Sequence, residues 1–143
     1  MGCGAGKKII QETRSVQEKN KFQLKVITQD KSVIEFKHDT DYEELPLSTI
    51  MNFLLFNHIH AQTFNANFIS KYNPQLKRFQ YFIQRLVGIP MENEDNPYEG
   101  KQWVAYINDS CIEWDEICEN ELSVKATDNV KFCFELISNK FHP

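Results

Sequence analysis

The stretch Trp103-Val104-Ala105-Tyr106-Ile107-Asn108-Asp109 decides the fold, because it predicts a buried strand that ends in a tight turn. Five apolar or aromatic residues follow one another, and the Asn-Asp pair behind them is typical of turns. Further along, Thr127-Asp128-Asn129 predicts another turn, and the run from Val130 to Ile137 predicts the closing strand. The C-terminal half is therefore expected to supply strands of one sheet.

A hairpin is expected near the start of the ordered chain. Phe22, Leu24 and Val26 alternate with polar residues, which is the period of a strand with one buried face. The polar cluster 29–32 predicts a turn, and Val33-Ile34-Glu35-Phe36 predicts the returning strand. These two strands are expected to pair with each other.

One main helix is expected after this hairpin, over about residues 48–62. Pro46 precedes it, and Ser48 or Thr49 is the expected N-cap. Apolar residues recur at helical spacing on a broad face, and a broad apolar face indicates burial against a sheet.

The order of elements predicts an α+β domain. The run from Phe79 to Ile89 predicts another strand, whereas residues 63–78 stay open between a loop and a packed segment. Strand, strand, helix, strand, strand, strand is a β-grasp-like order, with one main helix packed on a mixed four- or five-stranded sheet. The expected boundaries are a flexible tail at 1–21, the domain at 22–138 and a short tail at 139–143.

Three segments of the second half carry a resemblance to a known family. They are Leu86-Val87-Gly88-Ile89, Trp103 to Asp109, and Leu122 to Val130. Together they look like the β-grasp domain at the C-terminal end of transcobalamin and intrinsic factor, which also occurs as a free-standing domain in many microbial proteins. That family has a Gly-Ile strand end, a Trp-x-x-Tyr-x-Asn-Gly hairpin and a Gly-Asp pair before its last strand. The resemblance implies the same fold over about residues 22–137, with matching residues over about 86–137.

Two positions depart from the family pattern. Asp109 stands where the family has the hairpin glycine, and Thr127 stands where it has the glycine of Gly-Asp. Because Asp takes a positive φ with strain, a longer or bulged hairpin is expected at Asp109. In the cobalamin carriers a separate helical domain holds most of the ligand, so cobalamin is not expected here and no cofactor is predicted.

Charge is unevenly distributed along the chain. The net charge is −4, but residues 1–37 carry +4 and residues 38–143 carry −8. An acidic domain binds nucleic acid poorly, because duplex affinity comes chiefly from neutralising phosphates. No nucleic-acid partner is therefore expected.

The first residues carry the most specific functional pattern. Removal of Met1 would expose Gly2 for myristoylation, and Cys3 is suited to palmitoylation. Lys7 and Lys8 follow, and a second acyl chain or a basic stretch is what makes such anchoring stable. We therefore expect contact with a membrane surface, in a cytoplasmic, membrane-associated or ciliary location. The alternative is an unmodified Gly-rich start, and the spacing excludes a phosphate-binding loop.

Neither metal chemistry nor catalysis is expected. The four cysteines form no Cys-x-x-Cys pair, which argues against a structural zinc ion. His58 and His60 are two residues apart on the expected helix, so they point away from each other. No nucleophile, base and orienting group recur in a recognisable pattern, and we expect a non-enzyme.

The acidic segment 113–121 is expected to be irregular, and it supplies the predicted partner-binding residues. These are Glu113, Trp114, Asp115, Glu116 and Glu119. Trp114 is the aromatic residue most expected to be exposed, as an anchor for an unidentified, basic protein partner. The alternative interpretation is a solvated charged face. Trp103 and Phe134 are expected in the core.

Three functions fit these patterns. The first is a non-catalytic protein-interaction module tethered to a membrane by N-terminal acylation. The second is a structural subunit of a large protist assembly, such as an axonemal or organellar complex. The third is a small-ligand-binding β-grasp domain, and it rests on analogy with the family alone.

Overall fold

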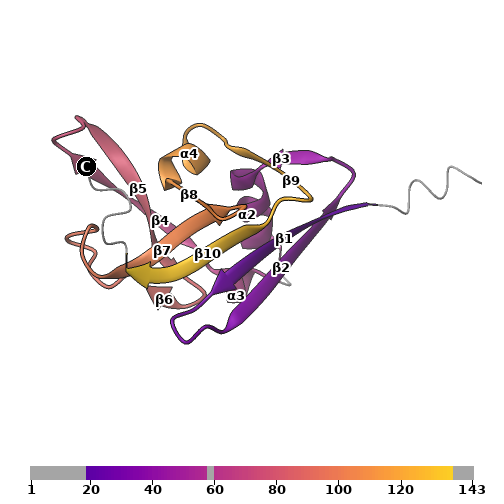
Figure 1. The fold of residues 1–143 in the computed structure, drawn as a ribbon, viewed down its shortest axis with the longest axis horizontal. Helices are drawn as coiled ribbons and strands as arrows, with labels where there is room; N and C mark the ends of the chain where they lie inside the picture. The colour runs from indigo at the N-terminus through magenta and orange to yellow at the C-terminus, as the bar shows by residue number, and fades with distance from the viewer. Residues whose placement is uncertain (1–18, 58–59, 137–143) are drawn as a thin grey trace, which may run out of the picture.

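The computed structural model describes residues 19–57 and 60–136, which form a mainly β structure with short helices (Figure 1). The strands are β1 Asn20–Ile27, β2 Val33–Thr40, β3 Glu44–Pro46, β4 Asn67–Asn73, β5 Arg78–Leu86, β6 Ile89–Pro90, β7 Lys101–Ile107, β8 Ser110–Ile112, β9 Ser123–Lys125 and β10 Val130–Leu136. The helices are α2 Leu47–Phe56, α3 Ala61–Phe64 and α4 Trp114–Cys118.

A mixed five-stranded sheet forms the centre of the molecule, in the order β2-β1-β10-β7-β8. β1 and β2 form the expected antiparallel hairpin, and β1 pairs in parallel with β10. The first and the last strand of the sheet in chain order, β1 and β10, therefore lie next to each other inside the sheet, and β2 and β8 form its edges. In Figure 1, β1 and β10 lie side by side at the middle of the sheet.

Helix α2 covers one face of this sheet, as its apolar face predicted, but it is shorter than expected. It runs from Leu47 to Phe56. Its N-cap position is Pro46 rather than Ser48 or Thr49, and no side chain caps it. Instead, the carbonyl of Leu122 accepts the hydrogen bond of the Leu47 N–H at 2.8 Å. A distant strand therefore replaces the local cap that the sequence predicted.

The core lies between the sheet and the helices. Trp103, Phe132 and Val26 are fully buried on three neighbouring strands, and Leu54 of α2 is buried to nearly the same degree. Trp103 packs beside Phe134 with ring centroids 5.1 Å apart. The prediction that Trp103 and Phe134 belong to the core is confirmed, since their side chains are buried.

The turn between β7 and β8 is tighter than expected. Ile107 pairs directly with Ser110, so Asn108 and Asp109 alone make the turn, and both have positive φ, 51° and 69°. The expectation of a longer or bulged hairpin was wrong. The Asn108 side chain accepts a hydrogen bond from the N–H of Asn129 at 2.8 Å, and Lys131 pairs with Asp109 at 3.1 Å. These contacts with the neighbouring strand offset the strain of two non-glycine residues.

The segment whose structure the sequence left open forms half of a second sheet. β4 pairs with β5 in an antiparallel hairpin, and β6 adds a short third strand. In Figure 1 this β4–β5 hairpin extends beyond the central sheet at the upper left, whereas β1 begins at the right. The hairpin and the start of the described chain therefore lie at opposite ends of the long axis.

Candidate interaction surface

The end of the β4–β5 hairpin is an exposed apolar and cationic surface. Tyr72 and Phe79 lie directly opposite each other, with ring centroids 5.3 Å apart in an edge-to-face contact. Tyr72, Leu76 and Phe79 are 54%, 50% and 55% exposed. Lys71 and Lys77 flank them, and no Asp or Glu in the described residues forms an ion pair with either lysine. We call these five residues the hairpin tip.

The turn of the hairpin is held by Asn73. Its side-chain oxygen accepts hydrogen bonds from the N–H groups of Gln75 and Leu76, at 2.9 and 3.2 Å. Such an Asx turn explains why Asn-Pro begins the loop. The N–H of Lys77 donates to the Asn73 carbonyl at 2.7 Å, and Lys77 itself has a positive φ of 56°. Local hydrogen bonds therefore define the shape of the tip.

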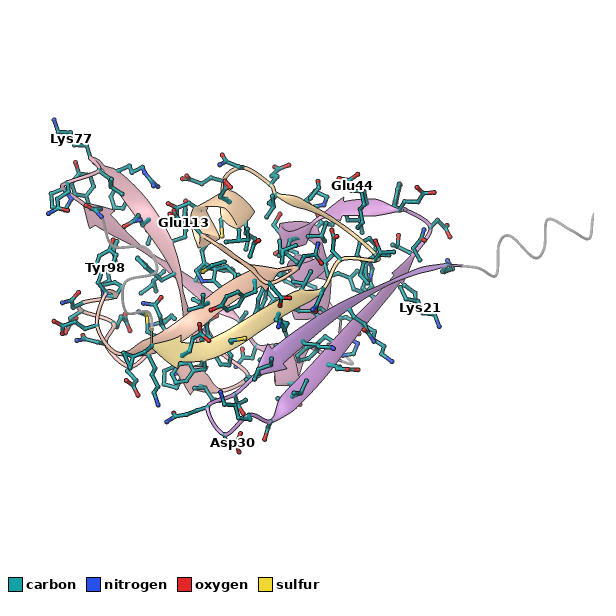
Figure 2. The ribbon with its side chains drawn as sticks, in the orientation of Figure 1. Lys21, Asp30, Glu44, Lys77, Tyr98 and Glu113 are labelled. Atoms are coloured by element: carbon teal, nitrogen blue, oxygen red, sulfur yellow. The ribbon has the colours of Figure 1, made fainter. Side chains whose placement is uncertain are left out.

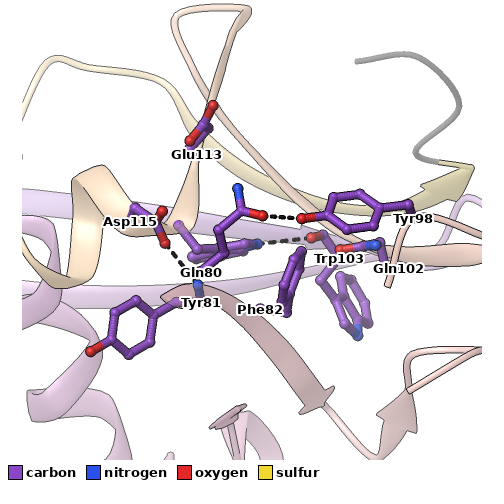
Figure 3. A pocket seen from close by; sticks show the side chains of 9 residues that line it. Gln80, Tyr81, Phe82, Tyr98, Gln102, Trp103, Glu113 and Asp115 are labelled. Carbon is purple, nitrogen blue, oxygen red and sulfur yellow. Dashed lines mark hydrogen bonds between the residues drawn. The ribbon is translucent and has the colours of Figure 1, made fainter. Parts of the chain in front are cut away.

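One face of the hairpin is tied to the loop before β7. The Asn73 amide donates to Gln80 Oε1 at 2.9 Å and to the Tyr98 hydroxyl at 3.0 Å. The Tyr98 hydroxyl in turn donates to Gln80 Oε1, and Figure 3 shows this bond. Next to it, the buried amide of Gln102 donates to the Pro97 carbonyl. These bonds fix the hairpin against the body of the protein.

The other face is tied to α4 through Asp115. Its carboxylate accepts a hydrogen bond from the N–H of Tyr81 at 2.7 Å and another from Arg78 Nη1. Glu113 lies 4.0 Å from Arg78 and adds to the pairing. The hydrogen bond to Asp115 raises the pKa of Arg78 above its ordinary value, with smaller contributions from nearby carboxylates. The charge of Arg78, next to the turn, is thus neutralised, whereas the neighbouring Lys77 forms no ion pair within the described residues.

The predicted exposure of Trp114 was wrong, because its indole belongs to the core. Trp114 is 5% exposed and packs on Phe132 with ring centroids 4.9 Å apart. Its Nε1 donates to the Trp103 carbonyl at 2.9 Å. The segment 113–121 is also not irregular, since Trp114 to Cys118 form helix α4. An apolar stripe inside an acidic run turns Trp114 and Ile117 inward, and Asp115 is buried beside them at 7% exposure.

The structure therefore divides the predicted partner-binding set. Trp114 and Asp115 point inward, while Glu116 and Glu119 are exposed and Glu113 is half-buried. Only these last three can meet a partner without rearrangement of the fold. The residues of the hairpin tip were missed, although the alternation on both sides of Asn-Pro was a usable hairpin signal.

A small cavity lies between α4, β5 and β7, lined by aromatic and polar side chains (Figure 3). Its volume is about 20 Å³, which is room for about one water molecule. Gln80, Tyr98 and Gln102 at its wall already bond to each other or to the backbone. A cavity of this size does not accommodate a metabolite.

His38 is unusual among the described polar residues because one of its ring nitrogens is buried without a hydrogen-bond partner. That nitrogen is Nδ1, and the ring lies on Phe53 of α2 with centroids 4.0 Å apart. Burial lowers the pKa of His38, and the charge of Asp39 opposes this in part. Within the described residues, no three His, Cys, Asp or Glu side chains come together to hold a metal ion.

The thiol of Cys118 is not activated as a nucleophile. Cys111, Cys118 and Cys133 form no disulfide with one another. Burial, followed by the charges of Asp115 and Glu119, raises the pKa of Cys118 to about 11. Such a thiol is protonated at neutral pH and is a poor nucleophile.

The predicted acylation site lies outside the described residues. Gly2, Cys3, Lys7 and Lys8 all precede Lys19, as does most of the expected tail. His58 also falls outside, in the gap at 58–59. Across the part of the chain that is described, none of the helices has the length and apolar content needed to cross a membrane.

Comparison with known proteins gives one distant structural neighbour. No family model matches the chain, and no curated protein matches its sequence. A crystal structure from Ruminococcus gnavus, described as a "putative metal binding protein", is similar with a TM-score of 0.49 and 14% identity. The match covers 82% of this chain and 97% of that chain. A likeness at this level establishes neither a shared family nor a shared function.

Proposed function

We propose that this chain is a non-catalytic interaction module, held at a membrane by acylation of Gly2 and Cys3, with the β4–β5 hairpin as its main contact surface. The observation that carries the proposal is the hairpin tip. Three large apolar side chains stay about half exposed at the end of a hairpin that is fastened on both faces near its turn, through Asn73 and Tyr81. Exposed apolar groups of this kind mark contact sites rather than packing defects.

The proposal includes a β-grasp-like fold. Its support is the strand order β2-β1-β10-β7-β8, with β1 and β10 parallel and α2 on one face. In this interpretation, the β4–β5 hairpin is an addition between the helix and the last three strands of the sheet. Segments that project from a rigid domain often carry binding residues.

A non-catalytic role fits the surroundings of the reactive groups. The Asp115 carboxylate accepts hydrogen bonds from the Tyr81 N–H and from Arg78, and the Cys118 thiol is protonated at neutral pH because its pKa is raised. The outward carboxylates Glu116 and Glu119 are available to a basic protein partner, with half-buried Glu113 beside them. A location at the cytoplasmic face of a membrane, including a ciliary membrane, follows from the acylation proposal.

The test is the intact mass of the native N-terminal peptide, together with fractionation of cells that express Gly2→Ala, Cys3→Ser or Gly4→Ala. We expect acyl groups on Gly2 and Cys3, and we expect Gly2→Ala to move the protein from the membrane fraction to the soluble fraction. Gly4→Ala is the matched control, because N-myristoylation requires glycine only at the second position. An unmodified native peptide, or a Gly2→Ala protein that stays on membranes, would contradict the proposal.

A further inference from the structure

We propose that the hairpin tip inserts into the interfacial layer of an anionic membrane. It would then be a second membrane contact in addition to the acylated N-terminus. The inference rests on the proposed function, because it names the partner of that surface. It assigns a binding role to Tyr72, Leu76 and Phe79 as inserting side chains, and to Lys71 and Lys77 as contacts with lipid headgroups.

Charge is the first argument for a lipid surface. The chain contains no Asp or Glu between Leu45 and Met91, and the hairpin carries four basic residues. Arg78, which lies beside the tip at the first position of β5, is paired with Asp115 and Glu113, whereas Lys71 and Lys77 form no ion pair within the described residues. Lysines near an anionic leaflet strengthen binding without any specific partner.

The shape and size of the surface favour a membrane over a protein. The tip is the end of a projecting hairpin, where Lys77 points away from the body of the protein in Figure 2, and its three apolar side chains are about half exposed. Three half-exposed side chains offer far less than the roughly 800 Å² per partner of a stable protein interface. A membrane needs no matching groove, and Tyr, Phe and Leu are suited to its interfacial layer.

Tyr42 is another exposed aromatic residue, but Asp41, Glu43 and Glu44 surround it in sequence. Anionic lipids would repel such a group. Charge complementarity therefore favours the hairpin tip over Tyr42.

Both contacts can reach the same membrane. Lys21 and Lys77 lie at opposite ends of the molecule in Figure 2, so the tail does not leave the domain near the hairpin. The 18 residues before Lys19 can span at most about 60 Å when extended. A domain of this size has a radius of gyration of about 13 Å, so that length is sufficient. A single myristoyl chain binds only marginally, and a second contact would make the attachment stable.

The first experiment is co-sedimentation of the full-length, non-acylated protein with vesicles of phosphatidylcholine alone or with about one third phosphatidylserine. We expect binding to the anionic vesicles only, weakened by salt. Lys77→Glu should lower the binding constant about fivefold or more, the scale expected for a lysine near the surface. Leu76→Ser should also weaken binding.

Two control variants test whether vesicle binding depends on the tip itself or on any exposed lysine or tyrosine. Lys31→Glu changes another turn lysine with positive φ, and Tyr42→Ser removes an exposed tyrosine from an acidic neighbourhood. Neither should reduce binding. Thermal unfolding of every variant checks that the fold is retained.

A second readout reports insertion directly. Both native tryptophans are buried, so the emission added by a Tyr72→Trp variant reports on the tip. Insertion predicts a blue shift with anionic vesicles and quenching by lipids labelled in the acyl chain. No binding of the wild-type protein, or binding that tip variants leave unchanged, would overturn the proposal and favour a protein partner for the tip. Because this protein lacks acyl chains, the outcome is independent of whether Gly2 is acylated.

Discussion

Replacing Asp115 by alanine should destabilise the whole domain, because this carboxylate fastens the hairpin to α4. The side chain of Asp115 is 9% exposed and accepts hydrogen bonds from Tyr81 N–H and from Arg78. Losing a charged acceptor for the Tyr81 N–H costs about 1.5–3 kcal/mol. The ion pair adds little, since the Arg78 side chain is 44% exposed and screened by water.

The expected loss in the free energy of unfolding is thus about 1.5–3 kcal/mol. For a domain of this size, 1 kcal/mol corresponds to about 4 °C, so the midpoint should fall by about 6–12 °C. Urea denaturation and calorimetry measure the two quantities. Arg78→Gln should cost clearly less than Asp115→Ala, because it leaves the hydrogen bond from Tyr81 N–H to Asp115 intact.

Glu116→Ala is the matched control, because Glu116 lies next to Asp115 in the same turn but is exposed. Its effect should stay within about 0.5 kcal/mol. If Asp115→Ala and Glu116→Ala had the same small effect, the acidic helix would be a solvated face and the anchoring role of Asp115 would be refuted.

Three further predictions concern single residues outside this anchor. Because the pKa of His38 is lowered in the folded state, the unfolded chain binds its proton first as the pH falls below about 6.5, so the free energy of unfolding should decrease towards acid. His38→Phe should reduce this pH dependence, as denaturant unfolding curves between pH 7 and pH 5 would show. A pKa of about 11 for Cys118, against 9.0 for a free thiol, should slow its alkylation at pH 8 about a hundredfold relative to the urea-unfolded protein, as peptide mass spectrometry would show. Asp109→Gly should raise stability by about 0.5–1 kcal/mol, because glycine relieves the positive φ and the lost ion pair with Lys131 is exposed; lower stability in thermal unfolding would show that this ion pair dominates.

The parts of the fold that follow from local pattern could be predicted from the sequence. Alternation in 22–26 gave the first strand, and the apolar face after Pro46 gave α2, because one-sided burial imposes these periods. The start of α2 could not be predicted, since its cap is the carbonyl of Leu122, 75 positions further along the chain. Local signals favoured Ser48 and Thr49, and a tertiary contact replaced them.

The candidate site was harder to predict than the fold. Charge density in 113–121 indicated a solvated loop, yet Trp114 and Ile117 are buried because they lie three positions apart, on one face of a short helix. The partner of Asp115 is Arg78, 37 positions earlier, and no local pattern joins them. The sequence therefore shows that the acidic residues lie together, but it does not distinguish the buried Asp115, which bonds to the hairpin, from the exposed Glu116 and Glu119.

The distribution of charge explains why the hairpin can serve as a contact rather than as a packing element. A surface that serves solubility alone carries both signs interspersed. Here Arg78, at the first position of β5, pairs with the buried Asp115 and with Glu113, while Lys71 and Lys77 form no ion pair within the described residues and lie beside exposed aromatic rings. The basic residues of one hairpin therefore have two roles: Arg78 stabilises the fold by pairing with a buried carboxylate, and Lys71 and Lys77 are left for recognition.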